Sequence, residues 1–251
     1  MRRASHTRGF TLLEFALVMT LFGLLVGSIL RGQELITTAK VRNMLDQRGA
    51  IQTAVSAFSD RHHLNAGDLT VAQAATISGA MVASGSAGDG ITALVLSGAG
   101  NESSTAFQNL TVARYISCAP CLTVTAAAPN PISTILNSPL NVFGSNLTYG
   151  FTASTVAGTI LWWDLTFAST RIIQTTGSGM TTSMLRELDL KGDDGSPGTG
   201  NFRLSSVGAG AGFSVAACAP SLAGVATVDA AALANWATTD DINCAGAWLV
   251  Q

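Results

Sequence analysis

An unbroken apolar run occupies residues 10–30, FTLLEFALVMTLFGLLVGSIL, and Glu14 is its only charged residue. At about 1.5 Å per residue, such a run crosses the roughly 30 Å apolar layer of a lipid bilayer as one helix. A carboxylate near the centre of such a helix costs roughly 2.5–3.5 kcal/mol on insertion scales, so an acid there usually has a partner. The pattern predicts a membrane-spanning helix with one acid that needs an explanation.

Beyond this run the pattern becomes amphipathic. Met44, Ile51, Val55 and Phe58 recur at spacings of seven, four and three, which places them on one face of a helix. The charged residues of the same stretch take other positions: Lys40, Asp46, Arg48 and Asp60. We therefore expect the helix to continue through residues 31–61 with one face buried against a sheet. We expect it to end between Arg61 and Gly67, with Gly67 as a C-terminal stop.

The middle of the chain, residues 65–117, is rich in Gly, Ala, Ser and Thr, and we interpret it as a variable surface insertion. Its stretch VAQAATISGAMVAS predicts a short helix, whereas ITALVLSG fits helix or strand. From Asn141 onward the pattern favours strands: SNLTYGFTAS, GTILWWDLTFAS, TRIIQTT, NFRLSSV, GFSVAACA and CAGAWLV. These segments predict an α+β fold, and the first three of them suggest an antiparallel meander. Aromatic residues in them favour core packing over a ligand platform: Tyr149, Phe151, Trp162, Trp163 and Phe167.

Composition bounds the function. The chain has 251 residues, a net charge of −2 and only 11% charged residues, so it has no global attraction to nucleic acid. Its histidines are His6, His62 and His63, and no nucleophile elbow, phosphate-binding loop or dinucleotide fingerprint accompanies them. We interpret the pair His62 and His63 as a solvated helix end, with metal capture as the alternative. We expect one globular domain and no enzymatic activity.

The residues before the apolar run explain its acid. Arg8-Gly9-Phe10-Thr11-Leu12-Leu13-Glu14 follows a short basic segment and resembles the leader signature of prepilins. The resemblance implies that a dedicated peptidase cuts after Gly9 and that Phe10 becomes an N-methylated N-terminus. The new amine would then pair with Glu14 of an adjacent subunit in a filament. The alternative is a simple signal anchor whose Glu14 snorkels toward the headgroups. Arginines in the leader favour a cytoplasmic N-terminus.

Two further segments resemble type IV pilin-like proteins: residues 32–61 and the DDG loop Gly192-Asp193-Asp194-Gly195-Ser196-Pro197-Gly198-Thr199-Gly200-Asn201-Phe202-Arg203. The chain departs from that pattern after the helix, where it reads HHLNAGD, and in its extra Cys118-Ala119-Pro120-Cys121. The resemblance implies a type IV pilin-like fold, in which a long N-terminal helix packs on an antiparallel sheet. Its parts would be a leader at 1–9, a membrane and filament-core helix at 10–30, its amphipathic continuation at 31–61 and an extracytoplasmic domain at 62–251.

The same resemblance implies a structural subunit, major or minor, of a type IV pilus. Its partners would be other pilin subunits, the prepilin peptidase and methyltransferase, an inner-membrane assembly platform and, before assembly, the bilayer. It would start in the bacterial inner membrane and end in a surface filament. The alternatives are a pseudopilin of a type II secretion system and a membrane-tethered ectodomain unrelated to pilins.

The DDG loop and the cysteines carry the remaining chemistry. Asp189, Asp193 and Asp194 offer hard oxygen ligands for calcium, whereas a turn whose Asp side chains accept backbone N–H bonds is the favoured interpretation. Export favours disulfides over zinc or reduced thiols. Cys218 and Cys244 resemble the pair that staples the C-terminal region of many pilins. For Cys118 and Cys121 a local disulfide is favoured, with zinc and free or redox-active thiols as alternatives.

Overall fold

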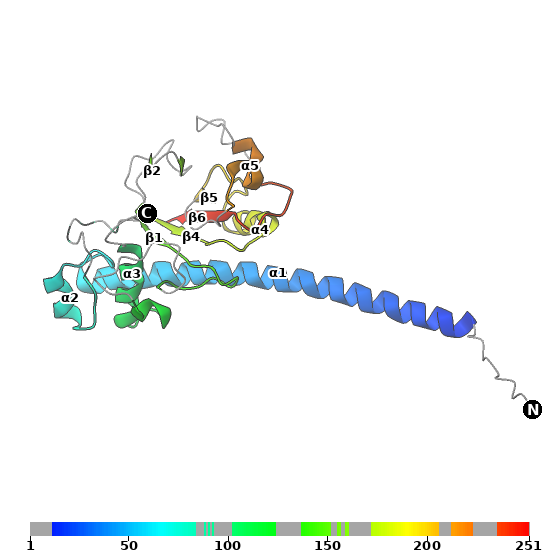
Figure 1. Cartoon of the computed structure of the whole chain (residues 1–251). Coiled ribbons are helices and arrows are strands. Elements are labelled where there is room, and N and C mark those ends of the chain that lie inside the picture. The colour runs from blue at the N-terminus through cyan, green and yellow to red at the C-terminus, as the bar shows by residue number, and fades with distance from the viewer. Residues whose placement is uncertain are drawn as a thin grey trace, which may run out of the picture. The chain divides into compact units, whose positions relative to one another are not determined.

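The computed structural model describes residues 12–83, 88, 90, 92, 102–123, 137–151, 155–156, 159–160, 172–205, 212–222 and 235–250. The chain divides into two compact units, residues 1–40 and residues 41–251, and each is described by itself. Helix α1 (Leu12–His62) contributes to both units. Figure 1 shows it as one continuous helix. The overall class is α+β, with a long apolar N-terminal helix and a small antiparallel sheet, as the sequence predicts.

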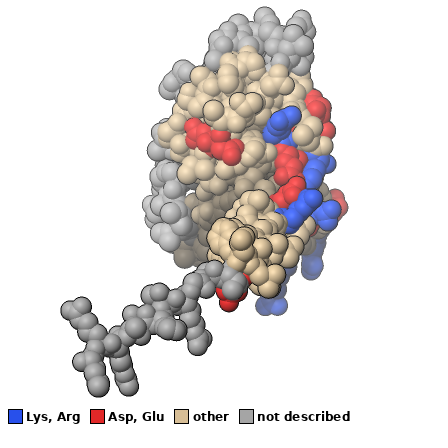
Figure 2. Space-filling model, turned by 90° about the vertical axis from the view of Figure 1, so that its right-hand side faces the viewer, with Lys and Arg blue, Asp and Glu red and all other residues tan. Residues whose placement is uncertain are grey.

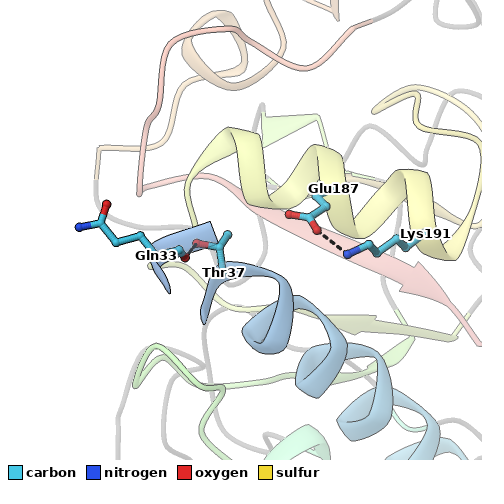
Figure 3. A network of polar contacts seen from close by, with 4 residues as sticks. All are labelled: Gln33, Thr37, Glu187 and Lys191. Carbon is cyan, nitrogen blue, oxygen red and sulfur yellow. Dashed lines mark hydrogen bonds and ion pairs between the residues drawn. The ribbon is translucent and has the colours of Figure 1, made fainter. Parts of the chain in front are cut away.

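In the first unit, the apolar residues of α1 are exposed: Leu12 is 87% and Leu24 is 70% accessible. Within the part of the chain that the structure describes, α1 is the one helix long and apolar enough to cross a membrane. Its hydroxyl side chains bond back to the helix, as when Thr37 Oγ1 donates to the carbonyl oxygen of Gln33 at 3.0 Å (Figure 3). Such back-bonding satisfies a hydroxyl without help from water.

In the second unit, one face of α1 enters the core. Its buried residues are Val41, Met44, Ile51, Ala54 and Phe58, and Val55 is partly buried, which confirms the predicted face. Burying a side chain of the size of Phe58 or Ile51 stabilises the fold by roughly 1.5–3 kcal/mol. The helix ends at His62, inside the expected interval, but Gly67 is not its stop. His63 takes the left-handed conformation (φ 54°) that ends the helix, and its N–H bonds to the carbonyl of Ser59 at 2.8 Å.

Four strands form the main sheet in the order β1 (Tyr149–Phe151), β4 (Ile172–Thr175), β6 (Ala245–Leu249) and β5 (Phe202–Ser205). All neighbours are antiparallel. The meander predicted for the first three segments is wrong, because the first and third of them, β1 and β4, pair directly with each other. The C-terminal strand β6 inserts between β4 and β5. The register places Tyr149, Gln174, Trp248 and Phe202 opposite one another across the four strands. A second, two-stranded sheet pairs β2 (Thr155–Val156) with β3 (Thr159–Ile160).

Helix α3 (Glu102–Val112) corrects the interpretation of residues 65–117 as a surface insertion. Phe107 and Leu110 of this helix are fully buried, and its polar residues hold the irregular chain beside it. The Gln108 amide donates to the carbonyl of Ala80 at 2.8 Å and accepts the N–H of Val82 at 3.2 Å. These bonds satisfy backbone groups of residues 80–82 that have no partner in a sheet. The many polar residues of α3 led to its interpretation as surface, although it is a helix of the core.

The remaining elements are short. Helix α2 (Val71–Ile77) lies in the predicted stretch VAQAATISGAMVAS and starts with a capping box between Thr70 and Gln73. Helix α4 (Thr182–Gly192), which the sequence analysis did not predict, begins with Thr181 as N-cap. Helix α5 (Val215–Cys218) stands where the sequence predicted a strand. The 3₁₀ turns are η1 (Pro120–Thr123) and η3 (Pro220–Leu222). Trp162, Trp163, Phe167 and most of ITALVLSG lie outside the described residues.

Candidate functional site

The proposed processing site lies at the chain's N-terminal end. Gly9 and Phe10 fall outside the described residues. Glu14 lies in the first turn of α1, where an acid interacts favourably with the helix dipole. The apolar residues that follow it are exposed in this single chain, with Phe22 61% and Leu25 59% accessible. An apolar surface of this length needs lipid or other helices around it.

The DDG loop brings together the three predicted carboxylates. Asp189 lies in the last turn of α4, Asp193 is its C-cap, and Asp194 follows. One carboxylate oxygen of each lies within 4.8 Å of the other two. Exposure differs across the cluster, since Asp189 is fully buried and Asp194 is exposed. The sequence therefore identified three acids that do meet in space.

Two of these carboxylates bond to the loop itself. Asp193 Oδ2 accepts the backbone N–H of Phe202 at 2.8 Å and that of Asn201. Asp194 Oδ1 accepts the N–H of Ser196 at 2.9 Å, and its other oxygen accepts the hydroxyl of Thr199. These bonds tie the start of β5 to the end of α4. They are the bonds expected of a turn in which Asp side chains take the place of backbone acceptors.

Asp189 is the acid with an unusual environment. Its Oδ2 accepts the indole N–H of Trp236 at 2.8 Å, and its Oδ1 accepts the N–H of Gly195 at 3.1 Å. Burial raises the pKa of Asp189 to about 7, against the lowering effect of these two bonds. The nearby Asp194 and Asp193 add a smaller upward effect on the pKa. This carboxyl group changes its charge near neutral pH.

The geometry bears on calcium. Calcium takes six to eight oxygen ligands, and ligating carboxylates must be ionised. Here the acids already accept loop N–H groups, and Asp189 is only partly ionised at neutral pH. Binding a cation would therefore require rearranged hydrogen bonds. The turn interpretation describes the loop as it stands, and calcium binding stays a prediction for experiment.

Aromatic side chains connect this loop to α1. The ring centroid of Phe202 lies 6.0 Å from that of Trp236 and 4.8 Å from that of Trp248. The guanidinium of Arg48 lies over the Trp248 ring at 5.5 Å, an arrangement with cation–π geometry. Burial lowers the pKa of Arg48, and the charge of Asp193 opposes that shift. Arg48 is thus half-buried and not on a purely solvated face.

No sequence pattern pointed to Trp236 or to the role of Arg48. Trp236 lies 47 positions from Asp189 in a segment with no strand or helix pattern, so no local signal pairs them. The helical position of Arg48 did carry information, because it lies four residues after the buried Met44. Lys191 and Glu187 form the ion pair that α4 exposes at i, i+4 spacing (Figure 3).

All four cysteines are disulfide-bonded, as Cys118–Cys121 and Cys218–Cys244, and none is free. The structure therefore agrees with disulfides and not with zinc or reduced thiols at either pair.

At the end of α1, the His62 ring centroid lies 4.7 Å from that of Phe58. Partial burial lowers the pKa of His62, and the charge of Arg61 adds to that effect. His62 thus packs on the core rather than standing fully in solvent.

The surface charge is sparse and mixed. Figure 2 shows Lys and Arg side chains beside Asp and Glu along one edge of the face in view, with uncharged residues over most of the rest.

Comparisons with protein-family models, with curated protein sequences and with solved structures find no match to this chain.

Proposed function

We propose that this chain is a structural subunit, major or minor, of a type IV pilus, with a type IV pilin-like fold and no catalytic role. The observation that carries the proposal is Glu14, the one acid of an apolar run that follows a basic leader ending in Gly9. Its place in the first turn of a helix with exposed apolar residues supports this function.

In the proposed mechanism, the peptidase removes residues 1–9 and leaves a methylated amine on Phe10. The amine of one subunit pairs with Glu14 of its neighbour when the apolar helices leave the bilayer and pack into a bundle. Lipid contacts are thereby replaced by helix contacts, and a charge that is costly in lipid is matched by an opposite charge. The partners are other pilin subunits and the inner-membrane assembly platform.

The second unit supports the role of an exported surface domain. Both disulfides lie in it, and disulfides persist in oxidising, extracytoplasmic compartments. Only 11% of the residues are charged, which suits a surface that packs against copies of itself more than one that binds a polyanion. The final location in this proposal is a filament on the cell surface.

The test compares two acids of the first unit. The wild type, Glu14→Ala and Glu34→Ala are expressed in a bacterium that carries a prepilin peptidase and a pilus assembly system. We expect the wild type and Glu34→Ala in the sheared filament fraction, because the exposed pair Arg31–Glu34 contributes little. We expect Glu14→Ala to be cleaved but at least about tenfold depleted from filaments, since the amine then lacks its partner.

The outcomes separate the alternatives. Filaments of Glu14→Ala at the wild-type level would contradict the proposed assembly mechanism. A cleaved protein whose short filaments stay in the periplasm would identify a pseudopilin of a secretion system. An uncleaved chain that stays monomeric in the membrane would identify a tethered ectodomain.

A further inference from the structure

The pair Cys118–Cys121 is built differently from the pair Cys218–Cys244. A disulfide restrains the unfolded chain more when it closes a longer loop, and the two pairs span 3 and 26 positions. Cys218 and Cys244 are fully buried, and their bond joins α5 to the residue before β6. A short local bridge adds much less to stability than this long one. The role of Cys118–Cys121 is therefore better inferred from the chemistry of this disulfide than from its contribution to stability.

Cys118 lines an open groove. The groove has a volume of about 510 Å³, and Cys118 is one of its lining residues together with Thr111, Arg114, Tyr115, Ile116, Ser117, Ala119 and Leu122. Cys121 is fully buried, whereas Cys118 keeps 6% of its surface accessible. Cys118, and not Cys121, is therefore the cysteine that faces a reagent in the groove.

The backbone presents this sulfur in a defined way. The N–H of Cys121 bonds to the carbonyl of Cys118 at 3.1 Å and also points to its Sγ at 3.3 Å. An N–H directed at sulfur stabilises a thiolate there more than a neutral thiol. Once the bond between the cysteines is open, Cys118 is therefore the better stabilised thiolate.

A cation stands at the same groove. Arg114 lies two residues after the end of α3 and adopts a left-handed conformation (φ 65°), and the N–H of Tyr115 bonds back to the carbonyl of Leu110 at 2.9 Å. Tyr115 is fixed in turn by an edge-on contact with Phe58 of α1, with ring centroids 6.0 Å apart. Arg114 is an exposed residue that lines the groove, and its positive charge attracts an anion that approaches it.

We propose that Cys118–Cys121 is a thiol–disulfide exchange site, whose co-substrate is a dithiol that enters the Arg114 groove as a thiolate. The incoming thiolate attacks Sγ of Cys118, forms a mixed disulfide with it and releases Cys121 as a thiolate, which takes up a proton. The second thiol of the co-substrate then loses its proton and attacks the other co-substrate sulfur, the one bonded to Cys118 in the mixed disulfide. This attack releases Cys118 as a thiolate. The dithiol is oxidised to a disulfide, and the cysteine pair gains two electrons and one proton, with Cys118 left as the thiolate. This site does not depend on assembly into a pilus.

The first experiment uses the wild-type full chain in mild detergent. Dithiothreitol at neutral pH is added to the folded protein, samples are quenched with a polyethylene-glycol maleimide, and peptide mass spectrometry locates the labels. We expect Cys118 and Cys121 to be labelled at least tenfold faster than Cys218 and Cys244. Equal rates for the two pairs, or prior opening of Cys218–Cys244, would overturn the proposal.

The second experiment asks which sulfur is attacked and whether Arg114 steers the reagent. With glutathione disulfide, the thiol of Cys121→Ser should form a mixed disulfide at least tenfold faster than that of Cys118→Ser; a reversed or equal order contradicts attack at Cys118. At low ionic strength, Arg114→Gln should slow reduction by 2-mercaptoethanesulfonate, a dianion as its thiolate, severalfold more than reduction by 2-mercaptoethanol, whose thiolate carries one charge. Arg186→Gln, an exposed arginine on α4, is the matched control and should alter neither rate. An unchanged ratio in Arg114→Gln would overturn steering by that cation.

Discussion

The indole N–H of Trp236 donates a hydrogen bond of 2.8 Å to the carboxylate of Asp189, and both side chains are buried. The contact fixes the end of α4 against the segment that leads into β6. Because Asp189 has a pKa of about 7 in the folded chain, against 3.8 as its ordinary value, this buried contact makes stability depend on pH.

We expect stability to fall as the pH rises from about 4 to about 7. In this window the folded state keeps a proton on Asp189, whereas the unfolded state has lost it, so deprotonation favours unfolding. The contribution is at most about 1.4 kcal/mol per pH unit. Asp189→Asn, which keeps an oxygen for Trp236, should remove this dependence. The free energy of unfolding in detergent, measured between pH 4 and pH 8, checks it.

The control for this prediction is Asp46→Asn, which changes an exposed acid of α1. It should retain the pH dependence of the wild type. An Asp189→Asn variant with an undiminished slope would show that other groups cause the pH dependence.

A glycine in the DDG loop should resist substitution. Gly200 has a φ of 71°, and a Cβ there would overlap the carboxylate of Asp193. Gly144 has a similar φ of 80° but no neighbouring heavy atom within 4 Å of such a Cβ. We expect Gly144→Ala to cost about 1 kcal/mol from backbone strain and Gly200→Ala about 2–4 kcal/mol, since it also displaces Asp193. Equal costs in chemical denaturation would contradict the role given to the Asp193 bonds.

The end of α1 offers a stabilising change. His63 adopts a left-handed φ of 54°, which favours glycine over any side chain with a Cβ. We expect His63→Gly to raise the free energy of unfolding by about 0.5–1 kcal/mol after the entropy cost of glycine. His62→Gly, one residue earlier, should lower it, because His62 is helical and packs on Phe58. Changes of the same sign in both variants would disprove this account of the helix end.

Calcium should have little effect on the folded chain. Asp193 and Asp194 already accept hydrogen bonds from the loop, and Asp189 holds a proton part of the time at neutral pH. We expect 1 mM calcium to shift the Tm by less than about 1 °C relative to a chelator, since ions stabilise only what they bind. A rise of several degrees that Asp194→Asn abolishes would establish a calcium site instead.

Local patterns predicted those parts of the fold that local forces determine. The apolar run from residue 10 and the spacing of Met44, Ile51 and Phe58 predicted α1 and its buried face. The capped helix at residues 71–77 also followed from its sequence. The strand predictions held for β1, β4, β5 and β6, where β-branched and aromatic residues cluster.

The features that the sequence did not predict depend on contacts between distant segments of the chain. The order of β6 between β4 and β5 is set by tertiary packing, and a list of strands in sequence order carries no such information. Helix α3 was missed because Gln108 and its polar neighbours are buried through bonds to backbone groups of residues 80–82. For the candidate site, the sequence identified the acids but not Trp236, whose bond to Asp189 links two remote segments.

The mass of the N-terminal peptide tests the central claim most directly. The wild type and Gly9→Ala are each expressed with and without an active prepilin peptidase, and intact and peptide masses are measured. The account predicts a mature wild-type chain that begins at methylated Phe10 only when the peptidase is active, and an uncut Gly9→Ala chain. A wild-type chain that still begins at Met1 beside an active peptidase would contradict the pilin proposal and favour a tethered ectodomain.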